Sequence, residues 1–273
     1  MSARRVKIPT EMKWGSGLLG IYLVWAIGWL VFRGPLYRPF ADMTRELIWP
    51  FQESFFLGTD IYGRSIFEIL STGLSYSLGM GLAVSSLSLA IGVVVGYLAV
   101  TGPRSVRVVM DLTTNLIFVF PSILIAILVM SVIGQSFAGL VFALVVTGWP
   151  GYARIVRGET QRVMGLTYIE SARAVGMPKV RLFRKCVFPA ILPVMVVHLV
   201  LGVSGVIVSE AALGFLGLGG SEYSWGAMLS MAKTVLLEAP FIVFIVSLCM
   251  AGLIIGLNLF GDGLRDYLDP RKD

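Results

Sequence analysis

Residues 76–101 read YSLGMGLAVSSLSLAIGVVVGYLAVT and contain no charged side chain. A helix needs about 20 mostly apolar residues to cross the hydrocarbon core of a bilayer. This segment therefore predicts a membrane-spanning helix. Gly92 and Gly96 have the GxxxG spacing, which lets a second helix approach closely. Glycines that are simply tolerated in a membrane helix would give the same pattern, so both interpretations stay open.

Five further segments have the same apolar character. Across the 273 residues, 56% are hydrophobic and 14% are charged, against about 25% charged residues in an ordinary soluble domain. This composition predicts a membrane protein and excludes a secreted disulfide scaffold, a disordered chain and a nucleic-acid-binding module. Pro121 and Pro150 are expected to kink their helices. The six expected spans are residues 15–32, 76–101, 108–133, 136–153, 190–212 and 239–260.

The basic residues predict which side of the membrane each loop faces. With a cytoplasmic N-terminus, 17 of the 22 lysines and arginines lie on the cytoplasmic side, eight of them within residues 154–185. The net charge of +6 therefore reflects a cytoplasmic face and indicates no nucleic-acid partner. The first span ends without a small-residue cleavage site, so we expect a retained helix. The five outer basic residues are Arg33, Arg38, Arg45, Arg64 and Lys233.

Few side chains in the spans suit chemistry. Cys186 and Cys249 have no metal-ligand spacing, and His198 is the single histidine. The spans are nearly free of charge, and no charge is evident that would mark a transport or proton path at the bilayer centre. This disfavours an ion-coupled secondary carrier. A membrane-embedded enzyme would need a nucleophile with a base, which is not apparent. A purely structural scaffold stays open as a third alternative.

The loop that follows the fourth span is the most informative. Thr167 and Glu170 stand as T-x-x-E, which predicts a capping box and a short helix that starts at Tyr168. Gly176 is expected to end that helix. Pro178 then opens a second helix in its first turn, and Pro189 closes it at the membrane. The small and apolar side chains of this pair of helices suit either a groove on another protein or packing against the membrane helices.

This loop resembles the EAA loop of ABC-importer permeases, which reads E-A-A, three residues, G, nine residues and I-x-L-P. Here Ser171 replaces the first alanine, and Cys186 and Phe188 replace the usual aliphatic residues. In that family the loop forms coupling helices that sit in a cleft of the cytoplasmic ATPase. The resemblance implies this role for Thr167, Glu170, Ser171, Ala172, Gly176, Met177 and Pro178.

Three more stretches resemble the dipeptide, oligopeptide and nickel branch of these importers, specifically its C-type (second) permease. They are Leu57–Arg64, Ser209–Gly219 and Asn258–Arg271. Asp60 can cap a helix that leads to the second span, and it can form an i,i+4 pair with Arg64. The alternative is that the two residues only fold an outer loop. The glycines make turns, or shape an outer gate or a seat for a binding protein. The candidates on the outer side are Gly58, Thr59, Asp60, Gly63, Arg64, Gly217 and Gly219, and those in the tail are Gly261, Asp262, Asp269 and Pro270. Asp262 is expected to cap a short terminal helix, which Asp269 and Pro270 end.

The resemblance implies an all-α polytopic membrane protein with six transmembrane helices, both termini in the cytoplasm, and the type I ABC importer permease fold. Residues 1–70 would hold the N-terminal tail, first helix and outer segment. Residues 71–262 would form the permease core with the coupling loop 158–190, and residues 263–273 the tail. No G-x-x-x-x-G-K-[ST] occurs, so the chain is expected not to be an enzyme and to bind no cofactor.

The implied partners are a homologous second permease, two cytoplasmic ATPase subunits that carry ATP and Mg²⁺, an extracytoplasmic substrate-binding protein and the lipid bilayer of a prokaryotic inner membrane. ATP binding would close the ATPases and switch the spans from inward-open to outward-open. Di- or oligopeptides are the first substrate expectation because they dominate the branch. Nickel or a metal chelate is the alternative, and glutathione and sugars are also imported by the branch.

Overall fold

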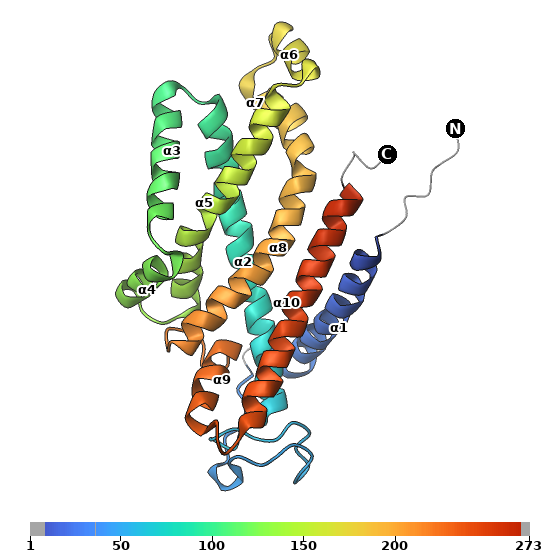
Figure 1. Ribbon diagram of the computed structural model, residues 1–273, viewed down its shortest axis with the longest axis vertical. Helices are drawn as coiled ribbons and strands as arrows, with labels where there is room; N and C mark the ends of the chain where they lie inside the picture. Colours follow the sequence, from blue (N-terminus) through green and yellow to red (C-terminus); the bar gives the residue numbers. More distant parts are fainter. Residues whose placement is uncertain (1–8, 36, 269–273) are drawn as a thin grey trace, which may run out of the picture.

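The computed structural model describes residues 9–35 and 37–268 (Figure 1). These residues are largely helical and form no β-strand, with only two isolated bridges between neighbouring loop residues. A π-helical turn (Phe183–Val187) joins two of the helices. The α-helices are α1 (Thr10–Arg33), α2 (Ile66–Thr101), α3 (Arg104–Val119), α4 (Ser122–Ile133), α5 (Phe137–Met164), α6 (Thr167–Ala174), α7 (Lys179–Leu182), α8 (Phe188–Phe215), α9 (Trp225–Ala232) and α10 (Pro240–Leu268).

Five continuous helical stretches are long and apolar enough to cross a membrane: α1, α2, α5, α7 to α8, and α10. The sixth expected span, residues 108–133, is wrong as a single helix, because α3 and α4 are bent by 92° where they meet. Phe120 is extended at this break, since the ring of Pro121 disfavours helical geometry in the preceding residue. Pro150 lies inside α5, which continues through it. Counting the bent pair as one span gives the expected six.

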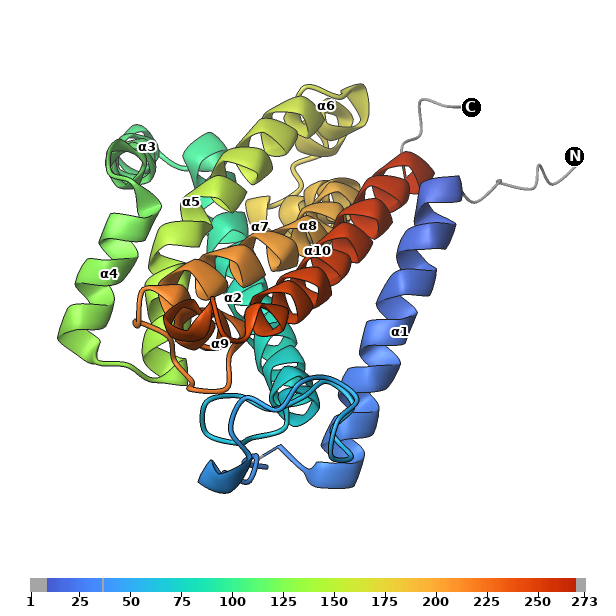
Figure 2. The same ribbon diagram turned by 60° about the horizontal axis from the view of Figure 1, so that its bottom comes forward.

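The helices surround α2, which packs mainly against α5 and α8, while α1 lies along α10 (Figures 1 and 2). The short helices α6 and α7 project at one end of the bundle. The loop between α1 and α2 lies with α9 at the opposite end. The start of α1 and the end of α10 point toward the α6 end, as expected if both termini lie on one side of the membrane.

The GxxxG pair of α2 brings this helix close to α5. A methyl group added at Gly92 would stand 2.5 Å from Tyr152 Cβ, and one at Gly96 would stand 2.6 Å from the Ala153 carbonyl oxygen. Carbon atoms at these separations overlap, so neither position has room for a side chain. Of the two interpretations of the motif, close helix packing is therefore the one the structure supports.

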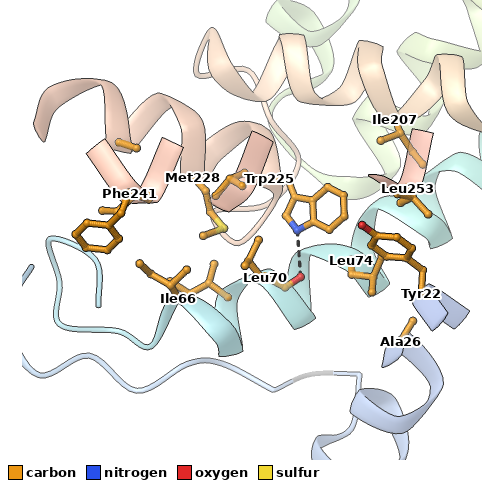
Figure 3. Close-up of a cluster of buried hydrophobic side chains, with 14 of the residues drawn as sticks. Tyr22, Ala26, Ile66, Leu70, Leu74, Ile207, Trp225, Met228, Phe241 and Leu253 are labelled. Carbon is orange, nitrogen blue, oxygen red and sulfur yellow. Dashed lines mark hydrogen bonds between the residues drawn. The ribbon is translucent and has the colours of Figure 1, made fainter. Parts of the chain in front are cut away.

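The largest buried cluster joins α1, α2, α8, α9 and α10 (Figure 3). Trp225 of α9 is fully buried, and its indole N–H donates to the Leu70 carbonyl of α2 at 3.0 Å. Tyr22 of α1 donates its hydroxyl to the Cys249 carbonyl of α10 at 2.8 Å. Both bonds satisfy a polar atom that would otherwise sit unpaired among apolar side chains, so they fix α9 and α1 to their neighbours.

The end of the described chain differs from expectation. Helix α10 runs without interruption to Leu268, so Asp262 lies inside a helix and does not cap a short terminal one. The apolar face of α10 continues through this region and keeps it packed, which removes the reason for a new helix start. Gly261 is buried against Leu201 of α8. Asp269 and Pro270 lie outside the described residues.

Candidate functional site

Residues 165–189, which form most of the predicted coupling loop 158–190, are named the docking segment below. Its first helix, α6, begins at Thr167 with Leu166 as the N-cap residue, and no side chain caps it. The predicted capping box is therefore wrong. Leu166 already has the extended N-cap geometry, and its carbonyl accepts the Glu170 N–H at 3.3 Å. Thr167 lies inside the first turn of α6, so its hydroxyl does not accept the Glu170 N–H.

The turn after α6 follows the prediction. Gly176 has a φ of +80°, a conformation that glycine adopts without strain. Its N–H donates to the Arg173 carbonyl at 2.9 Å, and the Met177 N–H reaches back to the Ala172 carbonyl at 3.1 Å. These two bonds form a Schellman motif and satisfy carbonyl groups at the helix end. Gly176 thus ends α6 and reverses the chain.

The second helix does not end where expected. Pro178 is the N-cap of α7, one residue before the helix begins at Lys179. From there the chain passes through the π-helical turn directly into α8, and Pro189 lies in the first turn of α8. The prediction that Pro189 closes the helix is wrong. A proline normally clashes with the carbonyl four residues earlier, and a π turn, with its wider ring, accommodates it at this position.

The docking segment has one packed face and one free face. Ile169, Leu182 and Val187 are buried in a cluster with α5 and α8, so part of the segment packs back on the membrane helices. On the other face, Val175 is 89% exposed and Val180 is 71% exposed. The two interpretations left open by the sequence therefore apply to different faces of the same segment.

Two contacts that the sequence did not suggest connect this region to the rest of the bundle. The ring of Tyr97 of α2 packs on Phe183 with centroids 4.4 Å apart, and its hydroxyl donates to the Lys179 carbonyl at 3.4 Å. Arg157 of α5 forms an ion pair with Asp111 of α3. Neither pair has a local sequence spacing, so no motif could reveal them. The docking segment is consequently held by α2 as well as by α5 and α8.

The outer candidates Gly58 to Arg64 come together in one tight turn before α2. The Asp60 carboxylate is fully buried and accepts bonds from the backbone N–H groups of Tyr62 and Arg64, both at 2.9 Å, and from Arg64 Nε at 2.8 Å. Thr59 donates its hydroxyl to the Arg45 carbonyl at 2.6 Å. Gly58 and Gly63 have positive φ angles, which this fold of the turn requires.

Asp60 does not cap a helix, because α2 begins only at Ile66 after Ser65. It forms the expected pair with Arg64, but within a loop and not along a helix face. The Arg64 guanidinium lies over the Tyr62 ring at 4.7 Å and approaches Glu222 at 3.9 Å. Burial raises the pKa of the nearby Tyr223 hydroxyl, and Glu222 adds to this rise.

Gly217 and Gly219 belong to a separate turn between α8 and α9. Gly217 has a φ of +80°, and Gly219 contacts Gly214 and Ser224. The loop that carries these glycines meets the Asp60 turn, because the Arg64 guanidinium approaches Glu222 at 3.9 Å and lies over the Tyr223 ring at 5.5 Å. The outer candidates therefore belong to two turns that are in contact through Arg64.

One buried carboxyl group contradicts the expectation of charge-free spans. Glu210 of α8 is fully buried, and Ser77 of α2 donates its hydroxyl to Glu210 Oε2 at 3.2 Å. Its other oxygen has no hydrogen-bond partner among the described residues. The sequence placed Glu210 inside a span but gave no sign of its burial between α2, α8 and α9.

A profile of the family described as "Binding-protein-dependent transport system inner membrane component" matches residues 88–273. The chain belongs to this family. It is a permease component of a binding-protein-dependent ABC importer, and it is a non-catalytic subunit. The expected all-α membrane fold and the expected branch of the family are both confirmed.

The permease is similar to curated relatives over most of its length. It is 36% identical over 218 residues to the glutathione transport system permease protein GsiD of Pectobacterium atrosepticum, which covers 79% of this chain and 72% of the relative. It is 32% identical over 222 residues to the di/tripeptide transport system permease protein DppC of Pseudomonas aeruginosa, which covers 81% and 73%.

A solved chain of the MetNI methionine ABC transporter in an inward-facing conformation has a TM-score of 0.63 to this permease at 20% identity. The match covers 74% of this chain and 97% of the solved one. At this identity the likeness shows the fold, which is that of type I ABC importer permeases.

Proposed function

We propose that this permease is one half of the translocation channel of a bacterial inner-membrane importer for short peptides. A homologous second permease would supply the other half. Two cytoplasmic ATPase subunits would bind ATP and Mg²⁺, so this chain would hold no cofactor, and an extracytoplasmic binding protein would deliver the solute. The names of the relatives support the substrate class, because glutathione is a tripeptide and DppC is named for di- and tripeptides.

The free face of the docking segment is the observation that carries the ATPase contact. Val175 and Val180 are large apolar side chains that protrude at the end of the molecule without a partner in the described chain. Exposed apolar side chains that gather at an end facing water mark a surface that another protein can cover. Glu170 and Ser171 are exposed beside them. We assign this face to a cleft of the ATPase, which places the α6 end in the cytoplasm.

The remaining candidates fit supporting roles in this proposal. Thr167 and Ala172 shape α6, while Gly176, Met177 and Pro178 set the turn that presents it. On the outer side, the Asp60 turn would stiffen the surface that receives the binding protein, and the turn with Gly217 and Gly219 would border the outer gate. In the tail, Gly261 would keep α10 close to α8, and Asp262, Asp269 and Pro270 would follow it on the cytoplasmic side.

The docking proposal is tested by replacing Val175 and Val180 with aspartate in the complete transporter. Burial of each valine contributes about 1.5 kcal/mol or more, so losing both should weaken ATPase binding at least about tenfold per valine. The measurement is the amount of ATPase that co-purifies with the tagged permease. Leu237→Asp is the control, because Leu237 is 98% exposed but lies at the opposite end. Undiminished ATPase recovery with both valines replaced would refute the assignment.

The substrate class is tested by uptake of radiolabelled trialanine and glutathione into cells that carry the transporter as their only peptide importer. We expect ATP-dependent uptake of at least one of them, competed by unlabelled short peptides. If neither peptide enters while the assembled complex hydrolyses ATP, the peptide assignment is wrong and the importer assignment stands.

A further inference from the structure

A cavity of about 590 Å³ opens between α5, α8 and α10 at the end of the bundle that carries α6. Its wall is partly apolar, with Val194 and Val197 of α8, and partly charged, with Glu159 and Arg162 of α5 and Arg265 of α10. Neither the docking segment nor the outer turn contributes to it. This cavity therefore needs an explanation of its own.

The charges of the cavity do not cancel. Arg162 is satisfied by Glu159, with a nitrogen–oxygen distance of 2.7 Å. The Arg154 guanidinium lies over the Phe118 ring of α3 at 4.0 Å, so it points to another helix. Arg265 has no hydrogen bond or ion pair within residues 9–35 and 37–268. The cavity consequently presents a cation without a direct ion-pair partner beside an apolar wall, while Glu11, Asp262 and Asp266 line a second cavity with Arg265.

Three glycines on the helices that flank this cavity have open space beside them. A side chain added at Gly151 or Gly158 of α5, or at Gly205 of α8, would meet no atom within 4 Å. This contrasts with Gly92 and Gly96, which are pressed against α5. Gly158 lines the cavity itself, and Gly151 lies seven residues, or about two turns, further from the α6 end on the same helix face.

The face of α8 repeats this spacing. His198 lines the cavity, and Gly205 lies seven residues beyond it. Gly151 and Gly205 lie outside the cavity, and between them Tyr152 of α5 contacts Gly202 of α8. The cavity itself, with an apolar wall and an arginine that has no ion-pair partner, suits a solute that carries a negative charge.

We propose that this cavity is the inner exit of the solute path and that Arg265 binds the carboxylate of the departing solute. The inference rests on the proposed function, since it assigns the cytoplasm to the α6 end and a peptide to the path. Every unmodified peptide carries a C-terminal carboxylate at neutral pH, and an arginine is the side chain best suited to bind it in two places at once. The apolar wall would contact the peptide side chain.

The test uses the whole transporter in nanodiscs with Gly158→Cys, a change for which the structure leaves room. Labelling of this cysteine by an anionic and by a cationic methanethiosulfonate is followed by mass spectrometry of the peptide that contains it. A cleft lined by one sign of charge raises association rates of opposite charges about tenfold or more, so the anionic reagent should react about tenfold faster than the cationic one. Adding Arg265→Gln should bring the two rates within about twofold of each other.

Arg104→Gln is the matched control, because it removes an exposed arginine from α3 outside the cavity and should leave the rate ratio unchanged. Millimolar trialanine should slow labelling, and trialanine amide, which lacks the carboxylate, should not. Equal protection by both peptides would overturn the carboxylate assignment. The exit site would be overturned if the cysteine at position 158 did not react. It would also be overturned if Arg265→Gln left the ratio of anionic to cationic labelling rates unchanged. If the same transporter variants still take up peptide in proteoliposomes, the importer proposal survives either failure.

Discussion

Removal of the Asp60 carboxylate tests how the outer turn is held together. The carboxylate is fully buried and the Arg64 side chain is 9% exposed. One oxygen satisfies two backbone N–H groups, and the other satisfies the guanidinium. Asp60→Ala therefore leaves a buried cation without its main partner and two amide groups without acceptors. Breaking such a buried pair from one side costs about 3–5 kcal/mol.

For a chain of this size, a loss of that order lowers the unfolding temperature by about 10 °C. The assay is thermal unfolding of the purified permease complex in detergent, followed by the fraction that stays monodisperse on size exclusion. Arg33→Met serves as the control, because it breaks the pair with Glu68 in which Arg33 is 49% exposed. An exposed pair contributes only about 0–1 kcal/mol, so this variant should unfold close to the parent temperature.

The double variant Asp60→Ala with Arg64→Met distinguishes a penalty for an unpaired charge from a general loss of packing. Because it removes the charge as well as its partner, it should be more stable than Asp60→Ala alone. The reasoning is refuted if Asp60→Ala unfolds within the range of the Arg33 control. It is also refuted if the double variant is the least stable of the three, since the guanidinium would then contribute through its contacts with Tyr62 and Glu222.

Two further changes test the helix contacts. Gly96→Ala should destabilise the complex by about 1–3 kcal/mol, because its methyl group overlaps the α5 backbone. Gly79→Ala is the control and should leave the unfolding temperature unchanged, because its methyl group meets no atom within 4 Å. Equal unfolding temperatures for the two variants would show that α2 and α5 separate easily. Tyr97→Ala should reduce uptake per ATP hydrolysed while ATPase still co-purifies, because the ring connects α2 to the docking segment. Tyr97→Phe keeps the ring and should retain most uptake, so equal losses in both variants would assign the effect to the hydroxyl.

Features that depend on a local rule were predicted well from the sequence. Apolar length located the spans, and the basic loops predicted that both termini lie at the α6 end. Gly176 ended α6 as expected, because a left-handed turn after a helix is a local property of glycine. The GxxxG spacing of Gly92 and Gly96 correctly indicated the face of α2 that packs closely against another helix. Its partner helix, α5, could not be predicted from the sequence of α2 alone.

Features that depend on tertiary packing could not be predicted. The capping box at Thr167 failed because Leu166 took the N-cap position. Ile169 of α6 reinforces this helix start, because it is buried in the cluster with α5 and α8. The burial of Glu210 depends on Ser77, which is 133 positions away. The cation in the inner cavity comes from α10, while its open glycine, Gly158, comes from α5 and its apolar wall from α8. Such groups become visible only when distant helices are placed together.

The error at Pro189 has the largest mechanical consequence. A helix that ended there would place a hinge between the docking segment and the membrane. Instead, helical structure runs from Lys179 to Phe215 over 37 residues, or about 55 Å, and it continues through the π turn and through Pro193. On the proposed function, a force on the docking segment therefore enters α8 directly. Because Glu210 lies on the same rod and is bonded to Ser77 of α2, the outer end of α8 must move together with α2 or break that bond. We infer that the buried carboxyl group and the continuous rod act as one unit, so that the inner docking face and the outer end cannot change position independently.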